Sequence, residues 1–352
     1  MANLKSNGYT VYFGNSALLS LNTFLLKKKY SRCFILCDEN SLQQCLPHVV
    51  IACPQLGTAD IIEVESGEVN KSLETCTNIW EIFLEQKADK NTLLINLGGG
   101  VISDLGGFMA SVFKRGIPYI HIPTSLLAMA DACLGGKNGI DFMGIKNSIG
   151  TISKPEAVFV CPPFLNTLEE HQVLNGWVEV FKMALIADKK MWNSLTDITQ
   201  VGDPSAFIFR SLELKNAIVL KDPLDAAQRK VLNFGHSLGH AIEALVMDAG
   251  EEILHGAAVC SGMILESHIA MQKKLISAKD YAEIRTRLLN TFGPMKTIPF
   301  SKTTILEKLG HDKKNKAGTF RFSLIKRIGA CAYDVEVNEK QISKALEAYN
   351  KA

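Results

Sequence analysis

Three histidines and a glutamate in the second half of the chain have side chains that commonly bind divalent metals. His236 and His240 lie four residues apart in NFGHSLGHAIEAL, so they share one face of a helix, and His255 follows in ILHGAAV. Ser237 rules out the H-E-x-x-H pattern of zinc proteases. With Glu179 of GWVEVFKMAL, two of the imidazoles predict an open three-ligand site typical of catalytic zinc. A single histidine here would more often be structural.

A glycine cluster in the first half follows an apolar segment that reads as a strand. In LLINLGGGVISDLGG the strand runs into Gly98, Gly99 and Gly100, and a helical pattern follows. Backbone N–H groups at such a helix start can approach an anion closely, so a dinucleotide pyrophosphate would fit. Ser103 replaces the last glycine of G-x-G-x-x-G, and the pattern alone fits a tight structural turn equally well.

The segment from residue 115 to residue 150 is dense in hydrogen-bond donors. Two of its lysines are flanked by glycine, in G-G-K and G-I-K-N, which lets the backbone and the ammonium groups converge on one ligand. A lone lysine would more often be a solvated surface charge. The cluster therefore predicts phosphate binding by Arg115, Thr124, Ser125, Lys137, Lys146 and Asn147, with Asp131 among them.

The elements that must position these residues indicate an α/β protein. Short apolar runs that suit a largely parallel sheet occur at residues 10–13, 33–37, 60–64, 92–97, 119–122 and 157–160. Long amphipathic segments follow at residues 168–187, 205–222, 236–248 and 255–273. We therefore expect a Rossmann-like nucleotide-binding domain over residues 1–160 and a mainly helical metal-binding domain over residues 161–352. The proline-containing segment CPPFLNTL, residues 161–168, is the candidate junction.

Composition excludes several classes of protein. The 352 residues are 47% hydrophobic and 21% charged, and Lys and Arg exceed Asp and Glu by only two, so no global field favours nucleic acid or an anionic membrane. The N-terminus lacks a signal-like apolar run, and no membrane-length apolar segment occurs, which favours a soluble cytoplasmic protein. The nine scattered cysteines contain no C-x-x-C pair and predict reduced thiols.

Seven segments together resemble the 3-dehydroquinate synthase family, in order over roughly residues 66–330. They are GGGVISDLGG, KRGIPYIHIPTSLLA, GGKNGIDFMGIKNSIG, NGWVEVFK, RKVLNFGHSLGHAIEA, LHGAAV and HDKKN. The resemblance implies conversion of 3-deoxy-arabino-heptulosonate 7-phosphate to 3-dehydroquinate and phosphate, a step of the shikimate pathway. It also implies a catalytic NAD, a divalent metal that is zinc or cobalt, and a homodimer.

The resemblance also implies a role for individual residues. It gives Glu179, His236 and His255 as metal ligands and Arg229 as the arginine that binds the substrate carboxylate. Arg115 resembles an arginine that reaches the neighbouring subunit's site. The residues that would line the pocket are Asp131, Lys182, Lys215, Asn233 and His240, and those that would take the phosphate are Lys137, Asn147, His240 and either Lys313 or Lys314. The NAD residues would be Gly67, Glu68, Lys71, Gly100, Val101, Ile102, Ser103, Asp104, Thr124, Ser125, Lys137, Lys146, Phe164 and Thr167.

Four positions depart from the family pattern, and the first is Ser125, which follows Thr124 where a second threonine is frequent. Asn138 follows the glycine-flanked lysine where threonine is common, and Trp177 is bulkier than usual. Ala257 replaces an acidic residue after H-G and so removes a carboxylate that could orient a ligand. Three alternatives remain: a sibling sugar phosphate cyclase, a metal-dependent polyol or glycerol dehydrogenase, and a degenerate NAD-binding protein. The pair Arg229 and Asn233 argues against the first of these.

Overall fold

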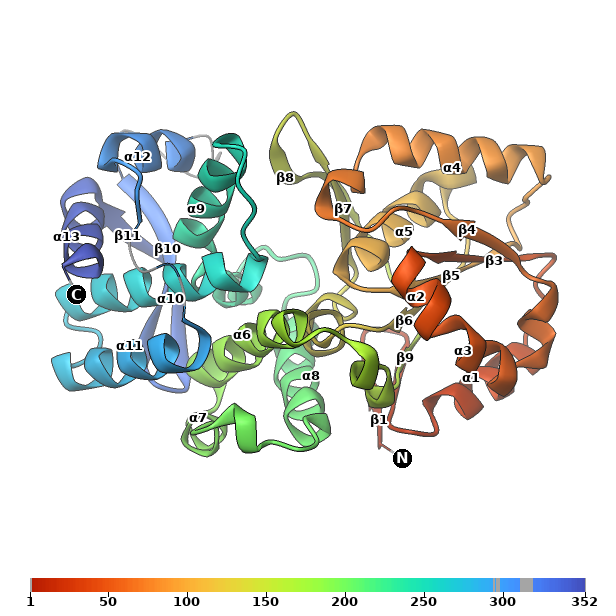
Figure 1. Cartoon of the computed structure of the whole chain (residues 1–352), viewed down its shortest axis with the longest axis horizontal. Helices are drawn as coiled ribbons and strands as arrows, with labels where there is room; N and C mark the ends of the chain where they lie inside the picture. The colour runs from red at the N-terminus through yellow and green to blue at the C-terminus, as the bar shows by residue number, and fades with distance from the viewer. Residues whose placement is uncertain (1, 294, 296–297, 311–318, 352) are drawn as a thin grey trace. The chain divides into compact units, whose positions relative to one another are not determined.

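The computed structural model describes residues 2–293, 295, 298–310 and 319–351 (Figure 1). The chain divides into two compact units. The first unit contains Met1–Val173 and Ile208–Asn216, and the second contains Leu174–Phe207 and Ala217–Ala352. The junction expected at residues 161–168 stays a prediction.

A seven-stranded sheet forms the centre of the first unit. Its strand order is β1-β2-β9-β6-β5-β3-β4, and all neighbouring strands are parallel except the pair β1 and β2. Six strands lie at the predicted apolar runs, and β1 is an additional edge strand. Their bounds are β1 Ala2–Lys5, β2 Thr10–Phe13, β3 Cys33–Cys37, β4 Asp60–Glu63, β5 Leu93–Gly98, β6 Tyr119–Pro123 and β9 Ala157–Val160.

Helices cover this sheet, which explains why its central strands are apolar on both faces. All six residues of β5 are buried. Helix α5 follows β5 directly, and its Leu105 and Met109 join Phe34 and Phe83 in one buried cluster. The predicted strand, glycine turn and helix at residues 92–113 are therefore confirmed. The helices are α1 Ala17–Leu26, α2 Glu39–Gln44, α3 Leu46–Ala52, α4 Leu73–Glu85 and α5 Gly100–Val112, with short turns at Pro54–Thr58, Glu68–Asn70, Phe113–Arg115, Ala128–Ala132 and Pro162–Thr167.

A hairpin of the first unit was not predicted from the sequence. Strands β7 (Lys137–Phe142) and β8 (Ile145–Ile152) pair antiparallel within the donor-rich segment. Asn138, Gly139 and Ile140 of β7 are buried although two of them are poor strand formers. Because packing against the rest of the unit stabilises this hairpin, local propensity could not reveal it.

The second unit is mainly helical, as predicted. Helices lie at each of the four predicted amphipathic segments, but a hairpin formed by β10 and β11 was not foreseen. No helix of the described residues is long and apolar enough to cross a membrane. The elements after residue 168 are α6 Glu170–Ala187, α7 Lys189–Ser194, α8 Ser205–Lys221, α9 His236–Asp248, α10 His255–Gln272, α11 Ala278–Phe292, α12 Lys302–Gly310, β10 Thr319–Arg327, β11 Ala330–Asn338 and α13 Glu339–Asn350, with short turns at Ile198–Gln200 and Gln228–Asn233. The middle of α8, Ile208–Asn216, belongs to the first unit.

Helix α5 approaches the sheet so closely that only glycine fits at Gly106. A Cβ atom built there would lie 1.9 Å from Oδ1 of Asn96, a buried residue of β5. The other end of that amide, Nδ2, lies 3.2 Å from Nδ1 of His121 in β6. The glycine therefore lets the helix that follows the glycine turn pack directly on the middle of the sheet.

We predict that Gly106→Ala destabilises the protein by about 1–3 kcal/mol, because Asn96 must move and its contact with His121 is lost. Urea denaturation of the purified variant measures the change. Val112→Ala is the control on the same helix, since Val112 is 43% exposed and its truncation should change stability by less than about 0.5 kcal/mol. Equal stability of the Gly106 variant and the control would contradict the close packing.

Candidate active site

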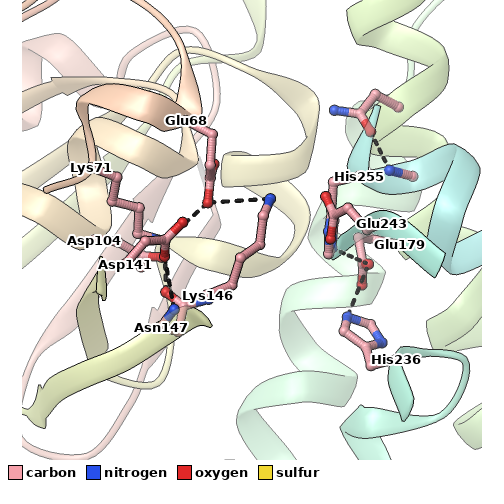
Figure 2. A network of polar contacts seen from close by, with 12 residues as sticks. Glu68, Lys71, Asp104, Asp141, Lys146, Asn147, Glu179, His236, Glu243 and His255 are labelled. Carbon is pink, nitrogen blue, oxygen red and sulfur yellow. Dashed lines mark hydrogen bonds and ion pairs between the residues drawn. The ribbon is translucent and has the colours of Figure 1, made fainter. Parts of the chain in front are cut away.

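The second unit brings together the three residues expected to bind a metal. Glu179 lies within α6, and His236 and His255 are the first residues of α9 and α10. Oε1 of Glu179 lies 3.6 Å from Nε2 of His236 and 3.8 Å from Nε2 of His255 (Figure 2). Two ligands of one tetrahedral zinc ion are about 3.4 Å apart when each metal bond is about 2.0–2.1 Å long. These atoms could therefore hold one ion with small adjustments.

His240 belongs to the same cluster. Nitrogen atoms of His236, His240 and His255 lie within 4.8 Å of one another. His240 is one helical turn after His236 on α9, which is the arrangement that their spacing predicted. The geometry thus gathers three imidazoles around Glu179, and His240 could bind either a metal or a substrate oxygen.

Glu179 itself has the environment of a buried metal ligand. Only 1% of the residue is exposed, and Oε2 forms an ion pair with the ammonium group of Lys182, one turn later on α6. Oε1, which faces the two histidines, receives no hydrogen bond from the described part of the chain. Because a buried carboxylate oxygen without a donor is costly, a cation at this position would compensate it. The donor set therefore fits a divalent metal.

The surroundings also keep His236 in the form that binds metals. Burial lowers the pKa of His236 well below its usual value, and the positive charge of Lys182 adds to the shift. Its Nδ1 lies 3.1 Å from the carbonyl oxygen of Phe234. If Nδ1 donates to that carbonyl, Nε2 is left with its lone pair toward Glu179, as a neutral ligand requires.

A glutamate that sequence reasoning missed supports His255. Oε2 of Glu243 lies 3.3 Å from Nδ1 of His255, and Glu243 is only 1% exposed (Figure 2). This carboxylate can orient the imidazole so that Nε2 points to Glu179. Glu243, on α9, thus provides a carboxylate that can orient a ligand, although Ala257 replaces the acidic residue that the family pattern has after H-G. The available signal was its position in NFGHSLGHAIEAL, three residues after His240 and on the same helical face.

Arg229 is held in a tight loop before α9. It is 2% exposed, and its guanidinium donates to the carbonyl oxygen of Pro223 at 2.9 Å. The loop is organised by Asp222, whose carboxylate accepts backbone N–H groups of Arg229, Ala226 and Ala227. These hydrogen bonds lower the pKa of Asp222. Asp222 was not predicted from the sequence, because it accepts hydrogen bonds from backbone N–H groups and is not part of a recognisable motif. Asn233 ends the same segment and is half-buried.

Of the departures from the family pattern, Trp177 has a packing role. It is 4% exposed, and its ring lies 5.6 Å from that of Phe207 at a steep angle. Asn138 is also buried, and its amide donates to the hydroxyl oxygen of Tyr119 at 3.1 Å. Both residues therefore contribute to the interior of their own unit.

The first unit brings together the charged residues expected at the NAD site. Nζ of Lys71 donates to Asp104 at 2.7 Å and lies 3.7 Å from Glu68 (Figure 2). Lys71 is only 3% exposed. Burial would lower its pKa, but the carboxylates of Asp104 and Glu68 outweigh that effect and raise the pKa of Lys71. The lysine is thus a charged, buried group paired with Asp104 in the first part of α5.

Two residues of the β7–β8 hairpin join this charged group. Nζ of Lys146 lies 3.4 Å from Glu68, and Oδ1 of Asn147 accepts from Lys71 at 2.6 Å. Asn147, which we expected to bind phosphate, therefore lies among the expected NAD residues. Asp141 accepts the backbone N–H of Asn147, and burial raises the pKa of Asp141 to about 6.

The glycine turn places Gly98 at the end of β5, and Gly99 precedes the first turn of α5. The segment from Gly100 to Asp104, with Val101, Ile102 and Ser103, forms that turn. Thr124 follows β6 and donates its backbone N–H to Gly98 at 3.0 Å, with Ser125 beside Gly99. These residues therefore share the carboxyl edge of the sheet, where ligands of such sheets bind. Phe164 and Thr167 lie in the turn Pro162–Thr167, and Gly67 has a positive φ of 116°.

The remaining expected site residues are placed as follows. Lys215 contacts Asp131 within the first unit, with Nζ 3.0 Å from Oδ1 and 2.6 Å from the backbone carbonyl oxygen. Lys137 begins β7 and is exposed, as is Arg115 in the turn after α5. Lys313 and Lys314 lie outside the described residues.

Comparisons with known proteins cover both halves of the chain. Residues 61–175 match the 3-dehydroquinate synthase N-terminal domain, and residues 176–315 match the 3-dehydroquinate synthase C-terminal domain. A 3-dehydroquinate synthase from Parabacteroides distasonis is 34% identical over 94% of this chain and 95% of its own length.

Solved structures agree with the fold. A 2-deoxy-scyllo-inosose synthase complexed with carbaglucose-6-phosphate, NAD+ and Co2+ has a TM-score of 0.86 at 25% identity, covering 98% of this chain and 100% of its own. A 2-epi-5-epi-valiolone synthase from Streptomyces hygroscopicus, solved with NAD+ and Zn2+, has a TM-score of 0.85 at 24% identity, covering 100% and 99%. Since the sequence matches extend over both units, the chain belongs to the 3-dehydroquinate synthase family.

Proposed function

We propose that this protein is a 3-dehydroquinate synthase that converts 3-deoxy-arabino-heptulosonate 7-phosphate to 3-dehydroquinate and phosphate. The observation that carries the proposal is the convergence of His236 and His255 on the buried Oε1 of Glu179, which receives no hydrogen bond from the described residues. Family membership and the charged group around Lys71 support it.

The residues of the second unit would act on the substrate's hydroxyl groups. A divalent metal held by Glu179, His236 and His255 would supply Lewis acidity, and zinc or cobalt suits these donors. Lys182, ion-paired with Glu179, carries a buried positive charge that can stabilise an oxyanion formed beside it. His240, four residues from His236, can hold or move a proton at its ring nitrogen.

The residues of the first unit would bind NAD, which the reaction uses and returns. The backbone N–H groups at the start of α5 suit the pyrophosphate, because a helix N-terminus favours an anion. Glu68 and Asp104 are acceptors suited to ribose hydroxyl groups, and Lys71 holds both carboxylates in place. Gly67, Lys146, Thr124, Ser125, Phe164 and Thr167 complete the proposed site.

Binding of the substrate's two anionic ends falls to different residues. Arg229 would bind the carboxylate, since a planar guanidinium forms a bidentate pair with it. Lys137 and Asn147, with Lys313 or Lys314, would take the phosphate, and Asp131 and Lys215 would line the pocket. Arg115 would reach the site of a second copy in a homodimer, for which its exposure leaves it accessible. We place the enzyme in the cytoplasm.

The proposed reaction predicts phosphate and 3-dehydroquinate without net NADH when the pure protein is incubated with NAD+, Zn2+ or Co2+ and the heptulosonate phosphate. Phosphate release and absorbance of NADH measure the two quantities. Turnover only with a sugar phosphate that lacks a carboxylate would instead favour a sibling cyclase. Net NADH formation with glycerol would favour a polyol dehydrogenase.

We predict that His255→Ala lowers kcat by at least about a hundredfold and removes bound metal, because an open three-ligand site loses one of its ligands. Turnover and metal content are measured together on the folded variant. His268→Ala is the matched control, since His268 lies on the same helix and contacts Gln272 instead of Glu179. Unchanged turnover in the His255 variant would overturn the proposed ligand set.

Glu243→Ala should weaken metal binding by about 10- to 100-fold, because the His255 imidazole loses the carboxylate that orients it. Glu243→Gln should weaken it less, since the amide oxygen can still accept from Nδ1. A competition titration of Zn2+ against a chelator measures both affinities. If Glu243→Ala binds zinc as tightly as the unchanged protein, Glu243 has no such role.

A further inference from the structure

A buried glutamate, Glu266, is hydrogen-bonded to the backbone on both sides of the proposed metal ligand His236. It is on α10, eleven residues after His255, and is fully buried. Its Oε2 accepts the backbone N–H of Gly235 at 2.6 Å, and its Oε1 accepts that of Leu238 at 3.1 Å. The backbone N–H of Ser237 is also hydrogen-bonded to this carboxyl group.

The N–H groups of Ser237 and Leu238 belong to the first turn of α9, which begins with His236, and that of Gly235 immediately precedes it. The first N–H groups of a helix have no partner within the helix, and a side chain just before it usually caps them. At α9 that position is Gly235, which has no side chain and adopts the left-handed conformation with φ of 81°. Glu266 therefore caps α9 from a different helix.

The close packing of α9 and α10 makes this long-range cap possible. A Cβ atom on Gly262, one turn before Glu266, would lie 2.0 Å from the carbonyl oxygen of Gly235. A Cβ atom on Gly239 would lie 3.0 Å from the Cα of Val259. The two backbones thus touch at glycines, and this contact brings the carboxyl group of Glu266 into reach of the first turn of α9.

The turn that Glu266 holds is also the turn that orients His236. The ring nitrogen Nδ1 of His236 lies 3.1 Å from the carbonyl oxygen of Phe234, the residue before Gly235. A shift of the peptide at Gly235 would move this carbonyl and rotate the imidazole. The carboxyl group of Glu266 therefore acts on the direction of Nε2 through the backbone.

The other histidine helix is capped in a similar way. Its second residue, Gly256, donates its backbone N–H to the side-chain oxygen of Asn175 on α6, at 2.5 Å. The helix that carries Glu179 thus caps the helix that carries His255, and that helix in turn caps the one that carries His236. Each of the three ligands lies on an element joined to the next by a buried cap.

We infer that Glu266 is a positioning residue for the metal site, which holds the first turn of α9 and so fixes His236. This inference rests on the proposed metal ligands. Glu266→Ala removes both acceptor oxygens. Glu266→Gln keeps one oxygen acceptor but turns an amide N–H2 group toward a backbone N–H.

The test is a titration of the metal-free protein with Co2+, followed by visible absorption, and of Zn2+ against a chelator. We expect Glu266→Ala to bind either ion at least about tenfold more weakly and to shift the cobalt spectrum, because the ligand geometry changes. Glu266→Gln should lie between Glu266→Ala and the unchanged protein. Ser267→Ala is the matched control, since Ser267 is the next residue of α10 and equally buried, and it should behave as the unchanged protein.

A cooperatively unfolding Glu266→Ala protein with unchanged affinity and cobalt spectrum would overturn the inference. If that variant does not fold, the same comparison is made on Glu266→Gln, and an unchanged spectrum there is equally decisive against it. If the unchanged protein binds neither ion, the proposed metal site is wrong, and the inference fails with it. The titration uses no substrate, so an incorrect substrate would leave this result unaffected.

Discussion

The carboxylate of Glu179 is buried, with only 1% of the residue exposed, and the proposed metal site of the second unit is built around it. Lys182 pairs with one oxygen, and the other oxygen faces His236 and His255. Burial and nearby positive charge lower the pKa of His236 and so favour its neutral form. A buried carboxylate oxygen that receives no hydrogen bond from the described residues is costly unless another partner compensates it. A divalent cation would provide that partner, and it would also supply the Lewis acidity that the proposed reaction uses.

The site also depends on residues that contact the proposed ligands or their backbone. Glu243 orients His255, and Glu266 and Asn175 hold the first turns of the helices that carry the histidines. Both histidines are the first residues of their helices, where backbone N–H groups have no partner within the helix. A small rotation of this first turn would displace the imidazole. Rigid support at these turns is therefore as necessary as the ligands themselves.

The first unit meets its own electrostatic requirement in a different way. Lys71 is buried among Glu68, Asp104 and Asn147, so the charges of that group are balanced by the protein itself. No side chain of the described residues caps the start of α5 at Gly99, so its first backbone N–H groups suit an anion. One unit thus balances its buried charges internally, whereas the other requires an ion.

Local pattern in the sequence determined much of this protein. The six apolar runs are strands, and the central ones, such as β5, β6 and β9, are apolar because both of their faces are buried. The amphipathic segments are helices. The spacing of His236 and His240 predicted a shared helical face, and the ordered segments predicted the family. The β7–β8 hairpin was not predicted, because tertiary packing stabilises polar and glycine-containing strands that local propensity disfavours. The β10–β11 hairpin was also not predicted, although its strands contain many aromatic and β-branched residues.

Only the tertiary structure decided which residues support the site. Glu266 lies 31 residues from Gly235 along the chain, and Asn175 lies 81 residues from Gly256, so no local pattern connects them. Each side chain accepts hydrogen bonds from backbone N–H groups, which every residue except proline possesses. The residue types of the donors therefore do not indicate that such a contact exists. Spacing along one helix is set by the helix itself, whereas contacts between helices are set by how closely their backbones pack.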